Sequence, residues 1–245
     1  MRFLFVAPSN SIHSHKWINC FVNMGHQVAW VSLNTAGAPK PADIFFTALE
    51  KPRNIFGWFN VCLRLAKIVR AFEPDVVHVH SAGLYGVLGL LTFFSPKIVT
   101  VWGSDVILNA ESFLKRSICK MILKNASLIT TDATHMIDGI RKIGVSSVPI
   151  EVIKFGIDTA SFKPLPSKVG VLENFCFNSG PKVISMRNLD PIYDVETLVH
   201  AAKIVTTIKP DVNFYLGGDG PQREFLIELI SNLGISGNCH FLGYI

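Results

Sequence analysis

The sequence predicts an α/β protein with two domains, each built on a parallel β-sheet with helices packed against it. Short β-branched and aromatic runs alternate with longer runs of helical apolar spacing along nearly all of the 245-residue chain. The alternation stops between residues 158 and 181, where three prolines and several small polar residues remove the periodic pattern, and it then resumes. We therefore expect a first domain over residues 1–157, a linker over 158–181 and a second domain over 182–245.

The first domain is expected to begin with a buried strand, because its N-terminal apolar run is shorter than that of a secretory signal and no cleavage site follows. Its longest apolar run, residues 84–94, contains two glycines. A membrane-spanning helix needs about 20 residues, so this run predicts a buried helix. We expect strands near 3–7, 28–33, 76–80, 98–101, 128–131 and 151–154, and helices near 15–24, 60–72, 84–94, 112–124 and 134–143.

The second domain repeats the pattern on a smaller scale. We expect strands near 182–186, 212–216 and 239–242, and helices near 195–208 and 221–233. This is little material for a parallel sheet that must be buried on both faces. The last residues, 241–245, read as the end of a strand and the start of a loop, without a polar tail. The sequence therefore predicts that the second domain is incomplete and that the chain is the front part of a longer protein.

The composition excludes several classes of protein. With 49% hydrophobic and 17% charged residues the chain is globular, and its net charge of +5 is spread too thinly for a nucleic-acid-binding surface. The five cysteines are odd in number and form no C-x-x-C pair, so neither a disulfide framework nor a zinc ribbon is indicated. A reducing cytoplasm is the expected location. The mild basic bias is compatible with an anionic substrate or with peripheral contact with the inner membrane face.

A glycine-rich turn between a predicted strand and a predicted helix is the clearest ligand-binding signal. Glycines let backbone N–H groups approach a ligand closely, proline suits the first helical position, and the positive end of a helix favours an anion such as a nucleotide phosphate. The residues of this glycine turn are Leu216, Gly217, Gly218, Asp219, Gly220 and Pro221.

Polar residues also follow four other predicted strands at the carboxyl end, where open α/β sheets bind ligands. The segment 9–17 is a polar turn into the first helix, or an ordinary connection with a serine cap. His78 and His80 alternate onto one face of their strand. They are conceivable metal ligands or buried core histidines, but a histidine at a strand tip is better suited to bind an acceptor or carry a proton.

Two further strand ends carry candidates for sugar and phosphate binding. Trp102 offers a ring face for stacking and Asp105 a carboxylate for hydroxyl groups, although a helix cap beside a packing tryptophan would look the same. Arg187 follows the first strand of the second domain, where its guanidinium would engage a diphosphate with two parallel hydrogen bonds. The alternative for Arg187 is an ordinary surface arginine, and its expected position opposite the glycine turn favours a function.

Taken together, these segments resemble a family-4 glycosyltransferase with the GT-B fold of two Rossmann-like domains. The resemblance covers the whole chain and lies in the order of its motifs. Ser11, His13 and Trp17 resemble the acceptor loop of the family. The other matching segments are DVVHVHSAG (75–83), TVWGSD (100–105), KFGID (154–158), RNLDPIYDVETLVHAA (187–202) and LGGDGP (216–221).

This resemblance implies transfer of a sugar from a nucleotide-sugar donor, such as a UDP- or GDP-sugar, to a glycan or lipid-linked acceptor on the cytoplasmic side. It implies retention of anomeric configuration, no bound metal and no cofactor other than the donor, in the synthesis of a surface polysaccharide. The candidate catalytic residues are His80, Asp105 and Arg187. The donor site would comprise Gly156, Arg187, Gly217, Gly218, Asp219 and Gly220, and the acceptor site Ser11, His13, Trp17 and Trp102 together with His80 and Asp105.

The chain departs from the family pattern at three points. Ile192 stands where many relatives carry a phosphate-binding lysine, and Trp102 stands where many carry a histidine. The Glu-x7-Glu segment of the family would lie beyond Ile245. Two alternatives follow from the fold and from these departures: a nucleotide-sugar epimerase, which the acceptor loop argues against, and a nucleotide-sugar-binding protein without turnover. A dehydrogenase is disfavoured, since no G-x-G-x-x-G follows the first strand.

Overall fold

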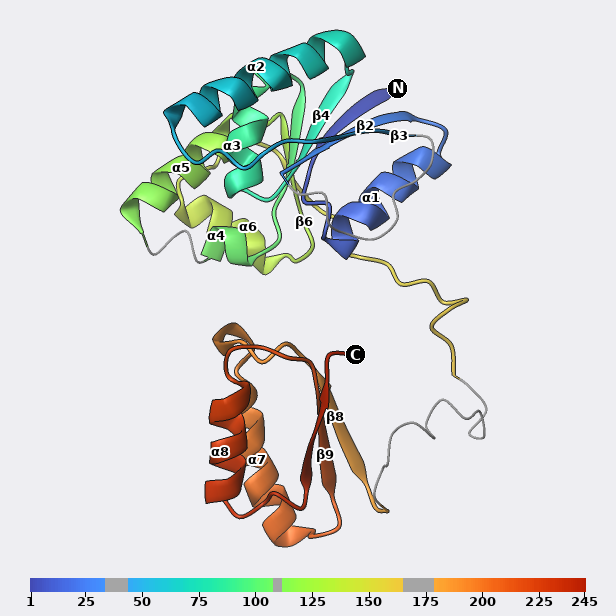
Figure 1. Ribbon diagram of the computed structural model, residues 1–245, viewed down its shortest axis with the longest axis vertical. Coiled ribbons are helices and arrows are strands. Elements are labelled where there is room, and N and C mark those ends of the chain that lie inside the picture. Colours follow the sequence, from blue (N-terminus) through green and yellow to red (C-terminus); the bar gives the residue numbers. More distant parts are fainter. Residues whose placement is uncertain (34–43, 108–111, 165–178) are drawn as a thin grey trace. The chain divides into compact units, whose positions relative to one another are not determined.

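The computed structural model describes residues 1–33, 44–107, 112–164 and 179–245 (Figure 1). The chain divides into two compact units, Met1–Thr159 and Ala160–Ile245. We describe each unit by itself. Residues 165–178 of the expected linker lie outside the described residues. None of the helices in the described ranges combines the length and the apolar character needed to cross a bilayer.

The first unit is built on a seven-stranded parallel sheet in the order β3-β2-β1-β4-β5-β6-β7. Its strands are β1 Arg2–Val6, β2 Gln27–Ser32, β3 Ile44–Ala48, β4 Val76–His80, β5 Lys97–Thr100, β6 Leu128–Thr131 and β7 Ile150–Val152. Its helices are α1 Ile12–Asn23, α2 Ile55–Phe72, α3 Leu84–Leu91, α4 Ser104–Ile107, α5 Phe113–Lys124 and α6 His135–Lys142. The predicted α/β class is therefore confirmed.

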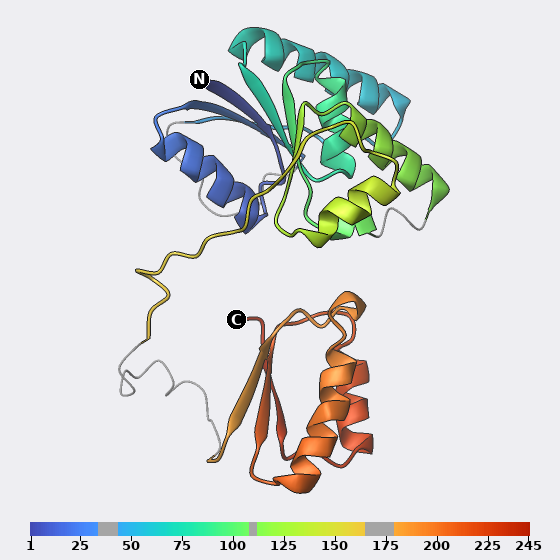
Figure 2. The ribbon, with the colours of Figure 1, turned by 180° about the vertical axis from the view of Figure 1, so that it is seen from behind.

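The two faces of this sheet bury two separate cores, because successive side chains of a strand point to opposite faces. On β1, Leu4 and Val6 join the core under α2, α3 and α5, whereas Phe3 and Phe5 join the core under α1. Figures 1 and 2 show α1 on one side of the sheet and α2, α3 and α5 on the other. Glycine on α3 permits close packing there, since a Cβ at Gly89 would lie 2.5 Å from Val79 Cγ2.

Some element boundaries differ from the sequence-based expectation. Helix α2 begins at Ile55 rather than near residue 60, because the side chain of Asn54 accepts a hydrogen bond from the Gly57 N–H and caps the helix. Strand β3 was not expected. It is an edge strand, and Phe45 on it is 75% exposed, so the alternation of a half-buried strand is weak there. The four-residue helix α4 was also not expected.

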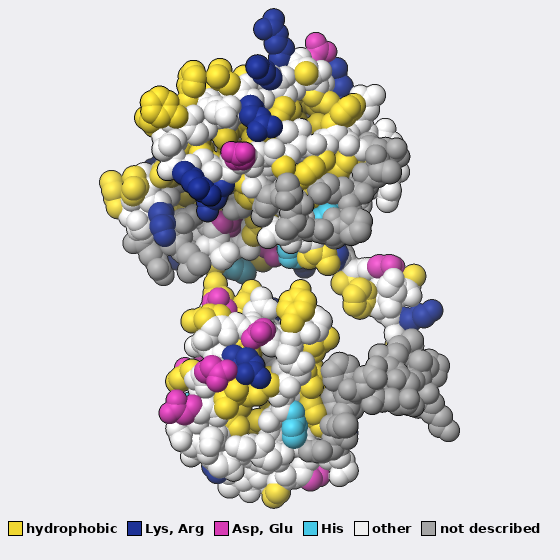
Figure 3. Space-filling view, viewed as in Figure 1, with side chains coloured by type: hydrophobic (Ala, Val, Ile, Leu, Met, Phe, Trp, Pro, Cys, Tyr) yellow, Lys and Arg dark blue, Asp and Glu magenta, His cyan; other side chains and the backbone are white. Residues whose placement is uncertain are grey.

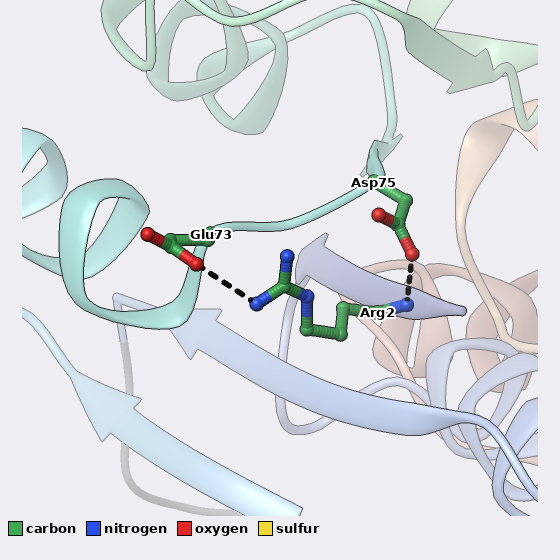
Figure 4. A network of polar contacts seen from close by, with 3 residues as sticks. All are labelled: Arg2, Glu73 and Asp75. Atoms are coloured by element: carbon green, nitrogen blue, oxygen red, sulfur yellow. Dashed lines mark hydrogen bonds and ion pairs between the residues drawn. The ribbon is translucent and has the colours of Figure 1, made fainter.

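The start of β1 is tied to the connection between α2 and β4. The Arg2 guanidinium lies 3.1 Å from a Glu73 carboxylate oxygen, and the Arg2 N–H donates to Asp75 Oδ2 at 2.7 Å (Figure 4). The Arg2 and Glu73 side chains are 39% and 71% exposed. Solvent therefore screens the ion pair, and it adds little to stability. It lies at the amino ends of β1 and β4, away from the carboxyl edge of the sheet.

The second unit has a three-stranded parallel sheet in the order β10-β9-β8. Its elements are β8 Lys182–Met186, the short 3-10 helix η3 Pro191–Tyr193, α7 Val195–Ile208, β9 Asn213–Gly217, α8 Arg223–Asn232 and β10 Cys239–Gly243. Helices α7 and α8 cover one face of the sheet (Figure 1), and Phe214 and Leu216 of β9 point into the core beneath them. On the other face Tyr215 stacks on His240, with ring centroids 4.9 Å apart.

Candidate functional site

The carboxyl ends of β1, β4, β5 and β6 lie along one edge of the first sheet, as parallel pairing requires. The loops that leave this edge enclose a hollow of about 400 Å³, which we call the crevice. Four of the predicted acceptor-site residues line it, namely Ser11, His13, Trp102 and Asp105. The remaining lining residues are Pro8, Ser81, Ser104, Asp132 and Phe155.

His13 lies in the first turn of α1, which begins at Ile12 and not near residue 15. Its ring is stacked on Phe155 and tilted against Trp102, with both centroids 4.8 Å away. Desolvation by burial lowers the pKa of His13, the nearby Lys16 lowers it further, and Asp132 opposes them. The buried Nδ1 has no hydrogen-bond partner among the described residues. Trp102 and Phe155 also stack on each other, with centroids 5.6 Å apart. The crevice therefore presents a neutral imidazole in a cluster with two aromatic rings, a surface suited to a sugar ring and its hydroxyl groups.

Asp105 connects two loops of the crevice. Its Oδ2 accepts a hydrogen bond from the Ala82 N–H at 2.7 Å, and its Oδ1 accepts one from the Trp102 N–H at 2.9 Å. Burial raises the pKa of Asp105, and these backbone hydrogen bonds counteract the rise. Because both carboxylate oxygens are engaged with the backbone, the geometry gives Asp105 a positioning function. A direct catalytic function for it stays a prediction.

His80 lies beneath the crevice and not in its wall. The ring is fully buried and meets Trp102 edge-on at 5.3 Å, and its Nδ1 lies 3.3 Å from Ser14 Oγ. Nε2 has no partner within the described ranges. The alternation of β4 brings His78 and His80 onto one face, with ring centroids 4.8 Å apart. His78 Nε2 is bonded to Thr100 Oγ1 at 2.7 Å, so this histidine belongs to a buried hydrogen-bonded row.

The buried histidines make an acid-labile element of the first unit. Desolvation lowers the pKa of His78 to about 3 and also lowers that of His80. Between pH 6.5 and pH 3 the unfolded chain therefore binds protons that the folded chain does not, so stability falls as the pH falls. Acidification from pH 7 to pH 5 is expected to lower the free energy of unfolding by about 2 kcal/mol for His78 alone. Urea unfolding followed by tryptophan fluorescence at the two pH values measures it.

The His78→Phe variant should lose this share of the pH dependence, whereas the exposed His135→Gln variant serves as the matched control. An unchanged pH dependence in His78→Phe would contradict the assignment. Tryptophan emission is a suitable signal because Trp17, Trp30, Trp58 and Trp102 all belong to the first unit.

Other residues differ from the sequence-based picture of the acceptor site. Trp17 packs into the core, where its ring lies 5.0 Å from His78 and 6.1 Å from Phe21, and it does not line the crevice. Asp132 and Phe155 were missed although both follow predicted strands at the carboxyl end. Their position directly after a predicted strand is the sequence signal that could have identified them. Gly156 lies in the same loop as Phe155, with nothing within 4 Å of its Cβ position.

The predicted donor-site residues of the second unit lie on adjacent strand ends. Met186 of β8 pairs with Gly217 of β9, so Arg187 and Gly218 follow side by side. A Cβ on Gly218 would lie closer than 3.0 Å to the Arg187 carbonyl oxygen, and one on Gly220 would lie as close to the Leu189 carbonyl oxygen. The Leu189 N–H also donates to the Asp219 carbonyl at 3.0 Å. The two loops are therefore in direct contact through their backbones.

The glycine turn leads into α8 later than expected. The helix begins at Arg223 with Gln222 as its N-cap residue, so Pro221 precedes it and is not its first residue. The Gln222 N–H donates to the Leu189 carbonyl at 3.0 Å, which adds another backbone contact between the two loops. The Arg187 guanidinium lies over the Tyr193 ring, 5.8 Å from its centroid. Tyr193 thus holds an exposed arginine near the turn.

Comparisons with known proteins identify the family of the chain. Residues 2–133 match the glycosyl transferase 4-like family model, and residues 174–245 match the family of group 1 glycosyl transferases. N-acetyl-alpha-D-glucosaminyl L-malate synthase from Bacillus anthracis is 23% identical over 198 residues, which cover 74% of this chain and 48% of that protein. The chain thus spans about half the length of this curated relative.

Two solved structures share the fold over the whole chain. Sucrose-phosphate synthase from Thermosynechococcus elongatus has a TM-score of 0.79 at 15% identity, and Anabaena HepE in complex with UDP and glucose has 0.74 at 17%. The alignment covers 100% of this chain and 70% of each solved chain. This likeness confirms the expected GT-B type of fold. Because the first family match extends over more than half of the sequence, the chain belongs to the glycosyl transferase 4-like family.

Proposed function

We propose that the protein transfers a sugar from a nucleotide-sugar donor, a UDP- or GDP-sugar, to a glycan or lipid-linked acceptor. The observation that carries this proposal is the contact between Arg187 and the glycine turn at adjacent strand ends, in a chain of this family. Anabaena HepE, which has the same fold, is described in complex with UDP and glucose and thereby supports a nucleotide-sugar donor. Synthesis of a surface polysaccharide in the cytoplasm is the proposed setting.

On the donor side, the glycines of the turn would let the backbone approach the nucleotide, and Arg187 would bind the diphosphate. As the bond between the sugar and the phosphate breaks, negative charge grows on the departing nucleotide. A guanidinium already held by Tyr193 stabilises that charge without further reorganisation. The proposed reaction retains the anomeric configuration and uses no metal, and the leaving phosphate oxygen takes the proton of the acceptor hydroxyl on the same face.

On the acceptor side, the crevice would bind a sugar or another hydroxyl-bearing group. The rings of His13, Trp102 and Phe155 provide apolar faces, and the neutral imidazole of His13 offers a hydrogen bond. Asp105 keeps the loops of Ala82 and Trp102 in register. This division gives the aromatic side chains the task of binding and leaves the stabilisation of charge to Arg187.

Two measurements on the intact gene product test the proposal. Calorimetry with UDP and GDP should show binding of one nucleotide, and incubation with the matching sugar donors and a glycan extract should release that nucleotide only when acceptor is present. Nucleotide binding without any transfer would favour the binding protein, and interconversion of the free nucleotide sugar would favour the epimerase. Binding of neither UDP nor GDP would contradict the proposed donor site.

A further inference from the structure

Two helices of the first unit, both packed against α3, carry positive charge without any acidic residue. Helices α2 and α5 contain no Asp or Glu, whereas the whole chain has 23 Lys and Arg against 18 Asp and Glu. The positive charge of the two helices alone exceeds the chain's net charge of +5. Their basic residues are Arg64, Lys67 and Arg70 on α2 and Lys115, Arg116, Lys120 and Lys124 on α5.

The same helices expose large apolar side chains to solvent. Phe56 is 78% exposed, Phe59 65% and Phe113 88%. Such side chains scattered singly would need no explanation, but here they gather among the cations. Figure 3 shows hydrophobic and basic side chains interspersed over the part of the first unit that carries α2 and α5. We call this surface the basic–aromatic face; its apolar members are Ile55, Phe56, Phe59, Leu63, Phe113, Leu114 and Met121.

The topology sets the orientation of this face. Helices α2 and α5 both contact α3, so they lie on the same side of the sheet. Each helix follows a parallel strand and returns toward the amino end of the next one, and its first turn therefore lies at the carboxyl edge. Most of the exposed apolar residues lie in the first halves of the two helices. They consequently lie toward the edge of the sheet that carries the crevice.

A basic hollow adjoins the start of α2. It has a volume of about 890 Å³, and Lys51, Arg53 and Arg64 line it together with Glu50. Basic side chains around exposed aromatic residues are the combination by which peripheral proteins bind anionic bilayers, since the apolar groups enter the headgroup region while the cations meet lipid phosphates. A nucleic acid would use the cations but would leave Phe56 and Phe113 without an apolar environment.

We propose that the basic–aromatic face binds the surface of an anionic lipid bilayer, with the N-terminal turns of α2 and α5 in the headgroup layer. The crevice would then open beside the membrane, so the acceptor class would be one anchored in the bilayer. This statement about the acceptor rests on the proposed glycosyltransferase function. The binding of the face to lipid does not.

Vesicle flotation tests the proposal with lipid alone, in the absence of donor and acceptor. The protein is expected to bind phosphatidylglycerol vesicles and not phosphatidylcholine vesicles. It should dissociate from the phosphatidylglycerol vesicles as the salt concentration rises. The double variant Lys67→Glu/Lys115→Glu should bind at least about thirtyfold more weakly, since one basic residue near an anionic surface contributes about 1 kcal/mol. The Phe56→Ser/Phe59→Ser variant should bind phosphatidylglycerol vesicles at least about tenfold more weakly, and the difference should persist at high salt.

Matched variants on the second unit control for charge and apolarity as such. These controls replace exposed residues of α7 or directly after it. They are Lys203→Glu/Lys209→Glu and Ile204→Ser/Ile208→Ser, and both should bind vesicles as the unchanged protein does. Circular dichroism verifies that every variant is folded. Absence of binding at low salt, equal binding by all variants, or preference for a DNA duplex over vesicles would overturn the proposal. Calorimetry with UDP and GDP on the same variants tests the donor site independently of lipid binding, so a failure of the lipid proposal can be told apart from a failure of the proposed donor site.

Discussion

Replacement of Arg187 by alanine is expected to reduce acceptor-dependent nucleotide release by about 10²–10³-fold, the usual cost of removing a group that stabilises charge in the transition state. The contact of its backbone with the glycine turn supports the proposal that this arginine binds the diphosphate. Its guanidinium is preorganised over Tyr193. Initial rates at saturating donor, measured with the intact gene product, give the effect on kcat.

Three further variants sharpen this test. Arg187→Lys keeps the charge but loses the planar fork, so it should recover only part of the rate. Tyr193→Leu should lower the rate by about two- to fivefold, the value of an exposed cation–π contact. Arg141→Ala removes another exposed arginine, on α6 of the first unit, and should have no effect. Unchanged turnover in Arg187→Ala would show that the charge of the departing nucleotide is stabilised elsewhere.

The strands and helices could be predicted where a buried element has a strong period. Strands β4 and β6 and helix α7 match the expected ranges residue for residue, because their apolar residues face a core. Strand β8 also matches its expected range, although Val183, Ile184 and Met186 on it are exposed. The misses have local causes. Asn54 starts α2 early through a side-chain cap. The edge strand β3 exposes Phe45, so its pattern does not alternate as a half-buried strand should.

The sequence could predict only those residues of the candidate site that follow the carboxyl end of a predicted strand. The rule that ligands bind at carboxyl ends led to His13, Trp102 and Asp105, which the fold brings together around the crevice. It could not show that the Asp105 carboxylate is engaged with two backbone N–H groups, or that Trp17 turns into the core. Those facts depend on side-chain directions that are set by tertiary packing.

Alanine at Gly218 is expected to destabilise the second unit by about 2–6 kcal/mol, through two separate costs. The residue has φ = +127°, a conformation that side-chain-bearing residues rarely adopt, and a Cβ there would collide with the Arg187 carbonyl oxygen. Strained backbone costs about 1–3 kcal/mol and overpacking a similar amount. Hydrogen exchange of peptides from β8 and β9 measures the loss. Tryptophan fluorescence reports the first unit alone and should not change.

Three other glycines of the same unit separate strain from collision. Gly220→Ala collides with the Leu189 carbonyl at an ordinary φ, so only the overpacking cost of about 1–3 kcal/mol is expected. Gly234→Ala has φ = +66° in open space and should lose about 1 kcal/mol from strain alone. Gly237→Ala has neither cost, and it should be neutral or slightly stabilising.

The order of these four variants tests whether stability and donor binding depend on the same contact. Gly218→Ala and Gly220→Ala push against the backbone of residues 187 and 189, so they should weaken UDP or GDP binding even when the unit is still folded. Gly234→Ala lies away from that contact and should weaken the fold without changing the affinity of the folded protein. If Gly218→Ala were as stable as Gly237→Ala, the loops of β8 and β9 would not meet as described. Arg187 would then lose the backbone contact that holds it beside the glycine turn.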